Sequence, residues 1–293
     1  MIFYLLYKFG HFLANTLSIK HAYFVAERFS DVQCFLSRKD RRAVQENLSK
    51  VLNKKPEECL GLARKAFRNF GLYLVDFFRV TQYTKEDFKK RVKIVGLENV
   101  DNVLKQGRGV IVLSAHLGNW EIAGIAMGAR GYDISAVTLN HKHKNIDDFF
   151  IDQREKKGMK VITMNSAMKK CVSCLRKAGL LALLGDRDFT DSGVMLKFFG
   201  KETSIPKGPV LLSLKTNAAI IPGFGIRTSR FDYTLFFEEP LDIKVDESLD
   251  KREAIKEAVK ATIPIMEKYI KKYPEQWLVF RRFWEKIEDP MAL

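Results

Sequence analysis

The sequence has few cysteines and no long apolar run. Only 4 of its 293 residues are cysteine, too few for the disulfide framework of a small secreted protein, so a reducing compartment is favoured. No stretch reaches the roughly 18 consecutive apolar residues that indicate a membrane-spanning helix. No repeat or low-complexity linker interrupts the chain, and 46% of it is hydrophobic, which excludes intrinsic disorder. The chain therefore has ample apolar material for a large core.

The charges are unbalanced. Lys and Arg number 50 against 35 Asp and Glu, for a formal net charge of +15. Such an excess indicates an anionic partner: nucleic acid, a phosphorylated lipid or a membrane surface. Nucleic acid is not expected, because the basic residues do not cluster with stacking aromatics as in a nucleic-acid-binding module. Residues 139–170 hold eight basic residues against four acidic ones, a stretch that would attract a phosphorylated glycolipid or an acidic carrier protein.

The first 18 residues predict an amphipathic helix. Lys8, His11, Asn15 and Ser18 recur at spacings of three, four and three, which places them on one narrow polar stripe. Large apolar side chains fill the rest of the circumference, as is typical of a helix that lies in a membrane interface. The alternative is a terminal helix docked on the protein's own core. No basic residue precedes Lys8 and no small-residue cleavage site follows, so a removable signal peptide is not expected.

The rest of the chain predicts an α/β fold, a largely parallel mixed sheet flanked by helices. Residues 20–90 are expected to be helical, after which short apolar strands alternate with helices. We expect one domain over 19–293, with a helical layer over about 19–90 and an α/β core over about 91–293. The expected strands are 92–95, 110–115, 134–139, 159–163, 180–184, 218–226 and 233–239; the expected helices of the core include 146–157, 167–178, 207–217 and one long helix over 250–272.

The sharpest chemical feature is the segment VLSAHLGNWEIAG. His116 stands where a buried strand ends, and ligands of open α/β sheets gather at the carboxyl ends of strands. Glu121, in the first turn of the next helix, is placed to reach back to the imidazole. A carboxylate on one ring nitrogen stabilises the imidazolium formed when the other removes a proton, so the pair suits a general base acting on a hydroxyl. The alternative is a buried histidine whose partner only satisfies its hydrogen-bonding groups and which has no catalytic role.

A second cluster follows the strand LLALL, where Asp186 and Asp188 occur in GDRDFTDSG. These carboxylates also leave the carboxyl end of a buried strand. Asp-rich turns are common in ordinary loops, so spacing alone does not assign them a function.

HLGNWE resembles the signature of the bacterial lipid A late acyltransferases, members of the lysophospholipid acyltransferase superfamily with its H-x4-D/E hallmark. The similarity extends through RRAVQENLSKVL, RNFGLYLVDFF, Arg154 with Gly158, the segment 184–224 and PEQWLVFRRFW. Phosphatidylinositol mannoside acyltransferases are also similar. The F-P-E-G-T-R segment of glycerolipid acyltransferases is missing, which weakens a lysophosphatidate reading.

The resemblance implies an O-acyltransferase. His116 would deprotonate a hydroxyl of the acceptor lipid, which attacks the thioester of acyl-carrier protein or acyl-CoA, and Glu121 would orient or charge-stabilise His116. Asp186 or Asp188 is expected to contact His116 or to hold the acceptor hydroxyl. No acyl-enzyme is needed, and no G-x-S-x-G elbow is present. We expect no cofactor and no metal; Cys171, Cys174, His141 and His143 lack the ligand partners of a metal or redox site.

Further residues are expected to bind substrate. Arg154 matches the family's arginine, and its guanidinium suits a phosphate or carboxylate. Arg281, in the C-terminal segment, is expected to bind substrate in the same way. Lys207 opens a helix whose N–H groups are placed to face phosphate, although a structural turn explains it equally well. Asn119 and Asp188 complete the expected substrate site.

The sequence therefore predicts a peripheral or monotopic enzyme on the cytoplasmic face of the bacterial inner membrane. It would move a fatty acyl chain to a lipid A precursor or related glycolipid, with a phosphatidylinositol mannoside or another sugar lipid as the alternative acceptor. From another class, the alternative is a non-catalytic basic protein that binds membranes or nucleic acid.

Overall fold

A computed structural model describes residues 2–139, 144–163, 167–189, 191–243 and 248–285. A seven-stranded sheet crosses it in the order β1-β9-β8-β2-β5-β3-β4. Neighbouring strands run parallel except β8 and β9, which are antiparallel. This confirms the predicted α/β class with a largely parallel mixed sheet. The strands are β1 (Val92–Val95), β2 (Val110–Ser114), β3 (Ile134–Thr138), β4 (Met159–Thr163), β5 (Leu180–Leu184), β8 (Ala219–Arg227) and β9 (Tyr233–Phe237).

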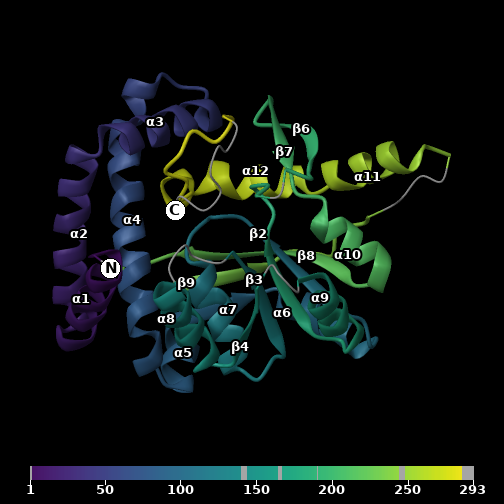
Figure 1. Cartoon of the computed structure of the whole chain (residues 1–293), viewed down its shortest axis with the longest axis horizontal. Coiled ribbons are helices and arrows are strands. Elements are labelled where there is room, and N and C mark those ends of the chain that lie inside the picture. The colour runs from purple at the N-terminus through teal and green to yellow at the C-terminus, as the bar shows by residue number, and fades with distance from the viewer. Residues whose placement is uncertain (1, 140–143, 164–166, 190, 244–247, 286–293) are drawn as a thin grey trace.

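Hydrophobic clusters cover both faces of the sheet. Because successive side chains of a strand point to opposite faces, one strand contributes to both clusters. Val110 and Val112 belong to one hydrophobic cluster and Ile111 and Leu113 to another. Figure 1 shows α5 to α8 below the sheet, with α11 and α12 above it. Helices α6 (Leu97–Lys105), α7 (Trp120–Ala129) and α8 (Lys144–Glu155) contribute to the first cluster; α9 (Ala167–Arg176), α10 (Gly208–Thr216), α11 (Lys251–Lys260) and α12 (Ile263–Lys272) contribute to the second.

The predicted helical N-terminal layer is present and stands along one side of the sheet (Figure 1). Its central helix, α4, packs against α1, α2 and α3. The shorter α5 starts with a reciprocal capping box, in which Thr84 and Asp87 each bind the other's backbone N–H. The helices of the layer are α1 (Ile2–Thr16), α2 (Ile19–Leu36), α3 (Arg38–Leu52), α4 (Leu60–Arg79) and α5 (Lys85–Arg91).

A small antiparallel hairpin, β6 (Val194–Phe198) with β7 (Lys201–Ile205), was not predicted. Its turn residues Phe199 and Gly200 both have positive φ, 49° and 74°. Such a turn matches the twist of two-residue hairpins. Its sequence signal was the alternation of buried Leu196 and Phe198 with polar or exposed neighbours.

The prediction of one long helix over 250–272 was wrong, because the segment forms α11 and α12. Thr262 separates them, and Pro264 lies in the first turn of α12. Proline has no backbone N–H and clashes with the preceding turn, but it is well tolerated at a helix start. The helix therefore ends and restarts here.

A buried carboxylate joins the helical layer to the sheet. Asp76 of α4 is fully buried and accepts hydrogen bonds from Tyr23 of α2 and Tyr233 of β9. Arg91 at the end of α5 and Arg227 at the end of β8 pair with its two oxygens at 2.9 and 2.6 Å. Burial by itself would raise the pKa of Asp76, but the two guanidinium groups and the tyrosine hydroxyls hold it below its usual value.

Replacing this carboxylate is expected to destabilise the fold strongly. Asp76→Ala leaves two arginines without their shared partner in a buried site, so the free energy of unfolding should fall by about 3–5 kcal/mol in chemical denaturation. Because the native pKa is lowered, the wild-type advantage should be full at neutral pH and should be lost as pH falls through that pKa. Asp152→Ala, which breaks an exposed pair with Lys156, is the control and should cost less than about 1 kcal/mol. Equal losses in the two variants would contradict this role of Asp76.

Candidate active site

The loop after β2 holds His116 at the carboxyl edge of the sheet. Its backbone is fixed by the C-terminal segment: Leu278 N–H donates to the His116 carbonyl and Gly118 N–H donates to the Gln276 carbonyl, both at 2.8 Å. Gly118 has φ +68°, and a Cβ there would lie 2.1 Å from the Gly225 carbonyl oxygen. Only glycine fits this approach. These backbone contacts therefore hold the loop, and with it the imidazole, in a fixed position.

The imidazole is paired with Asp186, which follows β5. Because β2 and β5 are parallel neighbours, their carboxyl ends bring the two residues together. His116 Nδ1 lies 2.7 Å from Asp186 Oδ1, and the His116 backbone N–H donates to Oδ2 at 3.1 Å. The structure thus identifies Asp186, rather than Asp188, as the aspartate that contacts His116.

Trp277 completes the environment of Asp186. Its indole N–H donates to Asp186 Oδ2 at 3.1 Å. Burial of Asp186 would raise its pKa, but the His116 imidazole and the hydrogen bonds from His116 and Trp277 hold the pKa below its ordinary value. An ionised Asp186 keeps the imidazole proton on Nδ1 and leaves Nε2 as a proton acceptor. The His116 side chain is 16% exposed, so the imidazole is not completely buried.

Aromatic rings surround the histidine. The Trp120 ring lies 5.3 Å from the imidazole and the Phe189 ring 6.1 Å, both edge-on. Trp120 also contacts Tyr73 of α4 at 4.8 Å. The imidazole therefore sits among apolar surfaces, which suits an apolar substrate.

The expectation that Glu121 reaches the imidazole differs from what the structure shows. Glu121 is buried, and its two carboxylate oxygens accept from Arg154 Nε and Nη2 at 2.8 and 2.6 Å. The Arg154 guanidinium lies 5.7 Å from the rings of Phe77 and Phe150. Glu121 stands in the first turn of α7 with its carboxylate directed to α8, so this bidentate pair fastens two helices together. The guanidinium expected to bind substrate is thus already engaged.

Two other expected substrate residues have structural partners. The Asn119 side chain accepts the Ile122 N–H at 3.0 Å and so caps α7; its amide also donates to the Tyr233 hydroxyl. Asp188 accepts from Gly193 N–H and Ser204 Oγ, each at 2.7 Å. Asp188 therefore ties the loop after β5 to the β6–β7 hairpin.

The remaining expected residues lie on different parts of the fold. Lys207 is the N-cap residue of α10. Arg281 lies in the C-terminal segment, where its carbonyl accepts from the buried Asn47 at 2.6 Å. Its positive charge acts on Arg187, the residue after Asp186. Of the two, Arg281 is therefore the one with a link to the histidine pair.

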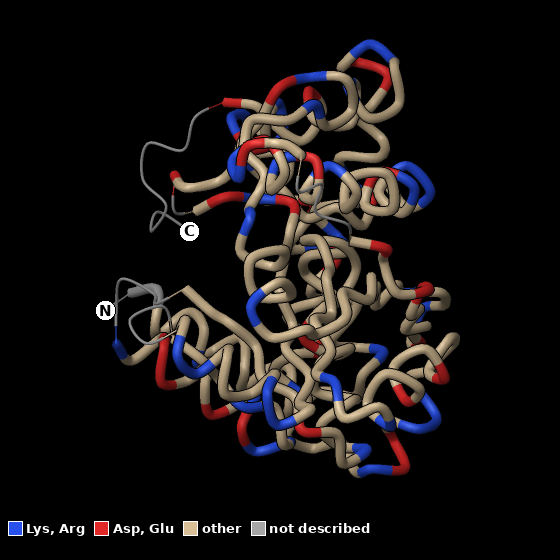
Figure 2. The backbone as a smooth tube through the Cα atoms, turned by 90° about the vertical axis from the view of Figure 1, so that its right-hand side faces the viewer, with Lys and Arg blue, Asp and Glu red and all other residues tan. Residues whose placement is uncertain are grey.

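Four of the eight basic residues in the stretch 139–170 pair with acidic side chains. Lys144, Lys156 and Lys160 pair with Asp148, Asp152 and Asp133 at 2.6–2.7 Å. Figure 2 shows Lys and Arg spread along the whole fold. This part of the chain therefore carries less uncompensated charge than its composition indicates. His141, Lys142 and His143 lie outside the described residues.

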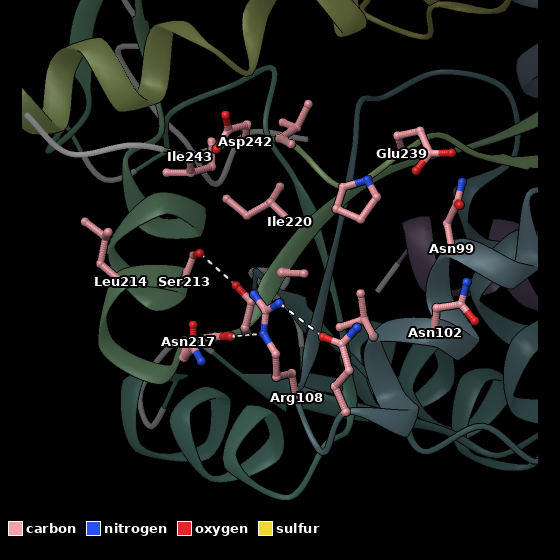
Figure 3. A pocket seen from close by; sticks show the side chains of 16 residues that line it. Asn99, Asn102, Arg108, Ser213, Leu214, Asn217, Ile220, Glu239, Asp242 and Ile243 are labelled. Atoms are coloured by element: carbon pink, nitrogen blue, oxygen red, sulfur yellow. Dashed lines mark hydrogen bonds between the residues drawn. The ribbon is translucent and has the colours of Figure 1, made fainter.

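A separate hollow of about 590 Å³ opens at the opposite end of β2 (Figure 3). Arg108 lies in its wall and donates from Nε to the Asn217 carbonyl at 2.9 Å. Arg108 precedes β2 and Asn217 precedes β8, whereas His116 follows β2. At about 3.3 Å per residue, the hollow and the imidazole are separated by the length of the strand. The hollow carries none of the acid–base pair.

Comparison with known proteins agrees with the chemistry of the His116–Asp186 pair. Residues 1–286 match the family described as bacterial lipid A biosynthesis acyltransferase. The chain belongs to this family. The family is described as one of acyltransferases, which implies an acyl donor and a lipid acceptor for its members.

Curated relatives of this chain include proteins named for phosphatidylinositol mannoside and proteins named for lipid A. The phosphatidylinositol mannoside acyltransferase of Mycobacterium tuberculosis (strain CDC 1551) is 30% identical over 186 residues, 61% of this chain and 59% of the relative. The lipid A biosynthesis palmitoleoyltransferase of Escherichia coli K12 is 25% identical over 232 residues, 78% of this chain and 72% of the relative. The matched segment thus spans somewhat less than two thirds of the mycobacterial protein.

Sequence reasoning missed Trp277 and Arg187 as parts of the site. Trp277 stands in the PEQW segment, already noted for its resemblance, but no spacing indicated that its indole meets a residue far earlier in the chain. Arg187 lies between the two aspartates in the motif GDRDF. Its position directly after Asp186 was the available signal.

The Glu121–Arg154 pair leads to a prediction that separates a structural from a substrate-binding arginine. Arg154→Gln leaves a buried carboxylate without its cation, so the free energy of unfolding should fall by about 3–5 kcal/mol. The matched double variant Glu121→Leu with Arg154→Met removes both charges and should recover much of that loss. Chemical denaturation of the wild type and of both variants measures these differences in the free energy of unfolding. Unchanged stability in Arg154→Gln would show that this guanidinium is not needed by Glu121.

Proposed function

We propose that this acyltransferase moves a fatty acyl chain from an acyl thioester, carried by acyl-carrier protein or coenzyme A, to a hydroxyl of a lipid A precursor or related glycolipid. The observation that carries the proposal is the His116–Asp186 pair at 2.7 Å at the carboxyl edge of the sheet. It supplies the base that an alcohol needs before it attacks a carbonyl.

In the proposed reaction His116 Nε2 takes the proton of the acceptor hydroxyl as its oxygen attacks the thioester carbon. The tetrahedral intermediate collapses by breaking the carbon–sulfur bond, and the imidazolium returns the proton to the leaving thiolate. The ionised Asp186 stabilises the imidazolium during both transfers. Helix α7 begins at Trp120, close to His116, and the backbone N–H groups of Trp120 and Glu121 are the proposed donors to the oxyanion.

In this mechanism Glu121 is a positioning residue. It does not share the imidazole proton; together with Arg154 it holds α7 against α8 and so fixes the helix whose start adjoins His116. Asn119 acts in the same way by capping α7.

The acceptor is proposed to be a phosphorylated glycolipid. A lipid A precursor is supported by the family match and by the Escherichia coli relative. A phosphatidylinositol mannoside is the second candidate, because the mycobacterial relative named for that lipid shares 30% identity over its matched segment. Both contain a sugar hydroxyl and a phosphate, so the chemistry required of the site is the same.

Activity of His116 and Asp186 variants tests the reaction. His116→Ala and Asp186→Asn should each lower the rate of transfer from a labelled acyl thioester to extracted bacterial lipids by about a hundredfold or more, because general base catalysis contributes about 10²–10⁴-fold. His21→Ala is the matched control, since His21 lies on α2 and is exposed. Full rates in both site variants, with folding intact, would refute these roles.

We also propose that α1 and α2 hold the enzyme on the cytoplasmic face of the inner membrane. The middle of the polar stripe of α1 faces the protein: Asn15 donates to the Phe78 carbonyl at 3.0 Å, and His11 contacts Phe78 and Phe149. Lys8 and Ser18, at the two ends of the stripe, are exposed. The opposite face exposes large apolar side chains, and α2 adds more. Those more than half exposed are Leu5, Leu6, Phe9, Phe12, Phe24, Phe29, Val32, Phe35 and Leu36.

This arrangement supports interfacial binding rather than spanning. No helix in the described part of the chain is long and apolar enough to cross a bilayer. Exposed apolar patches of this kind mark interaction sites, and a lipid acceptor must reach the histidine from a membrane. A helix docked only for its own burial would turn its large apolar side chains inward, whereas α1 leaves four of them more than half exposed.

Substitution on α1 tests the membrane proposal. The triple variant Leu6→Ser, Phe9→Ser and Phe12→Ser removes three side chains that each contribute about 1.5–3 kcal/mol when fully buried in apolar surroundings. Its partition onto vesicles of anionic phospholipid, followed by sedimentation, should weaken by at least about a hundredfold. Leu214→Ser on α10, also an exposed leucine, should leave partition unchanged. Equal partition of the triple variant and wild type would refute anchoring by this face.

A further inference from the structure

Arg187 follows directly after Asp186, in the loop that holds the His116–Asp186 pair. Its guanidinium is directed over the Phe189 ring at 4.7 Å, and the contacts among the described residues include no hydrogen bond or ion pair from it. Its neighbour Asp186 is adjacent in the chain, but the oxygens of Asp186 accept from His116 and Trp277. Arg187 thus interacts electrostatically with Asp186 but does not form a hydrogen bond with it.

This arginine is unlike the other arginines buried around the site. Arg154 is held by Glu121 and Arg227 by Asp76, each through charged hydrogen bonds. Burial lowers the pKa of Arg187, and although Asp186 opposes that effect, the charge of Arg281 adds to it. A partly buried guanidinium next to a second positive charge is costly unless an anion joins them. An anionic group of a bound molecule would therefore stabilise the Arg187 guanidinium.

The position of Arg187 ties that anion to the reaction. The Phe189 ring lies 6.1 Å from the imidazole and 4.7 Å from the Arg187 guanidinium carbon, so Arg187 is no farther from the imidazole than those two distances combined. A molecule that spans that distance can therefore contact Arg187 and the imidazole at once.

We propose that Arg187 binds a phosphate of the acceptor lipid, with Arg281 supplying a second positive charge. The proposal rests on the acyl transfer proposed above, which brings phosphorylated molecules to His116. A guanidinium fork matches two oxygens of a phosphate. The phosphate then holds the sugar so that a hydroxyl meets His116 Nε2.

The acyl donor also carries phosphate, but its geometry fits less well. The extended pantetheine arm separates the thioester sulfur from the nearest phosphate by roughly 15 Å at ordinary bond lengths. An extended arm would therefore carry its phosphate past Arg187, and the donor would have to bend to use this guanidinium. The acceptor phosphate, which is attached to or near the reacting sugar, is the better match.

Equilibrium binding to the full-length protein in detergent micelles tests this assignment without turnover. The acceptor probes are a tetraacylated glucosamine disaccharide bisphosphate against the same lipid after phosphatase treatment, and phosphatidylinositol monomannoside against a diacylglycerol monomannoside. The donor probes are S-hexadecyl coenzyme A and S-hexadecyl pantetheine. The variants are Arg187→Gln and Arg187→Lys. Arg176→Gln is the matched control, because Arg176 is exposed before β5 whereas Arg187 follows it.

Wild type should prefer the phosphorylated member of at least one acceptor pair, and Arg187→Gln should weaken that binding by about ten- to a hundredfold, the value of a charged hydrogen bond. Arg187→Lys should recover part of it, and binding of the phosphate-free lipid should not change. Loss confined to S-hexadecyl coenzyme A would overturn the acceptor assignment, as would an equal loss in Arg176→Gln or no phosphate preference in wild type. Phosphate binding through Arg187 by a protein that transfers no acyl chain would refute the proposed function alone.

Discussion

The proposed active site depends on one buried carboxylate, Asp186. It is fully buried, yet it accepts from the ring and backbone of His116 and from the indole of Trp277. These bonds join the ends of two neighbouring strands to the C-terminal segment of the chain. They also compensate the cost of burying a charge, which would otherwise be several kcal/mol. The catalytic role proposed for His116 rests on this arrangement, because the same carboxylate orients the ring and fixes its proton.

Two further buried carboxylates build the frame around that centre. Asp76 joins the helical layer to β8 and β9, and Glu121 joins α7 to α8 through Arg154. Asn119 connects the two: it caps α7 and its amide contacts Tyr233, which in turn donates to Asp76. The helical layer is thus bonded to the helix that adjoins His116. The apolar faces of α1 and α2 belong to this layer, so the surface proposed to meet the membrane is part of the same framework.

The strands were predictable because each short apolar segment is buried on both faces in a parallel sheet, and the helical layer because its apolar spacing is regular. The hairpin β6–β7 and the break at Pro264 depend on turn residues and a proline that are present in the sequence but were not used in the prediction. At the site, the ends of strands identified His116 and Asp186. The partners of Glu121 and Arg154 were not predictable, because spacing places Glu121 near His116 in sequence, whereas the direction of its side chain is set by the packing of α7 on α8. Trp277 is far away in sequence, and only the fold brings it to Asp186.

The central claim is that Asp186 holds the proton of His116 on Nδ1 and leaves Nε2 free to act as the base. Nitrogen-15 NMR of histidine-labelled protein measures this directly, and with only 5 histidines in the chain the His116 signals can be assigned from a His116→Ala spectrum. The account predicts a protonated Nδ1 and an unprotonated Nε2 in the neutral ring, with that preference lost in Asp186→Asn. A neutral ring protonated on Nε2 in the wild type would contradict it.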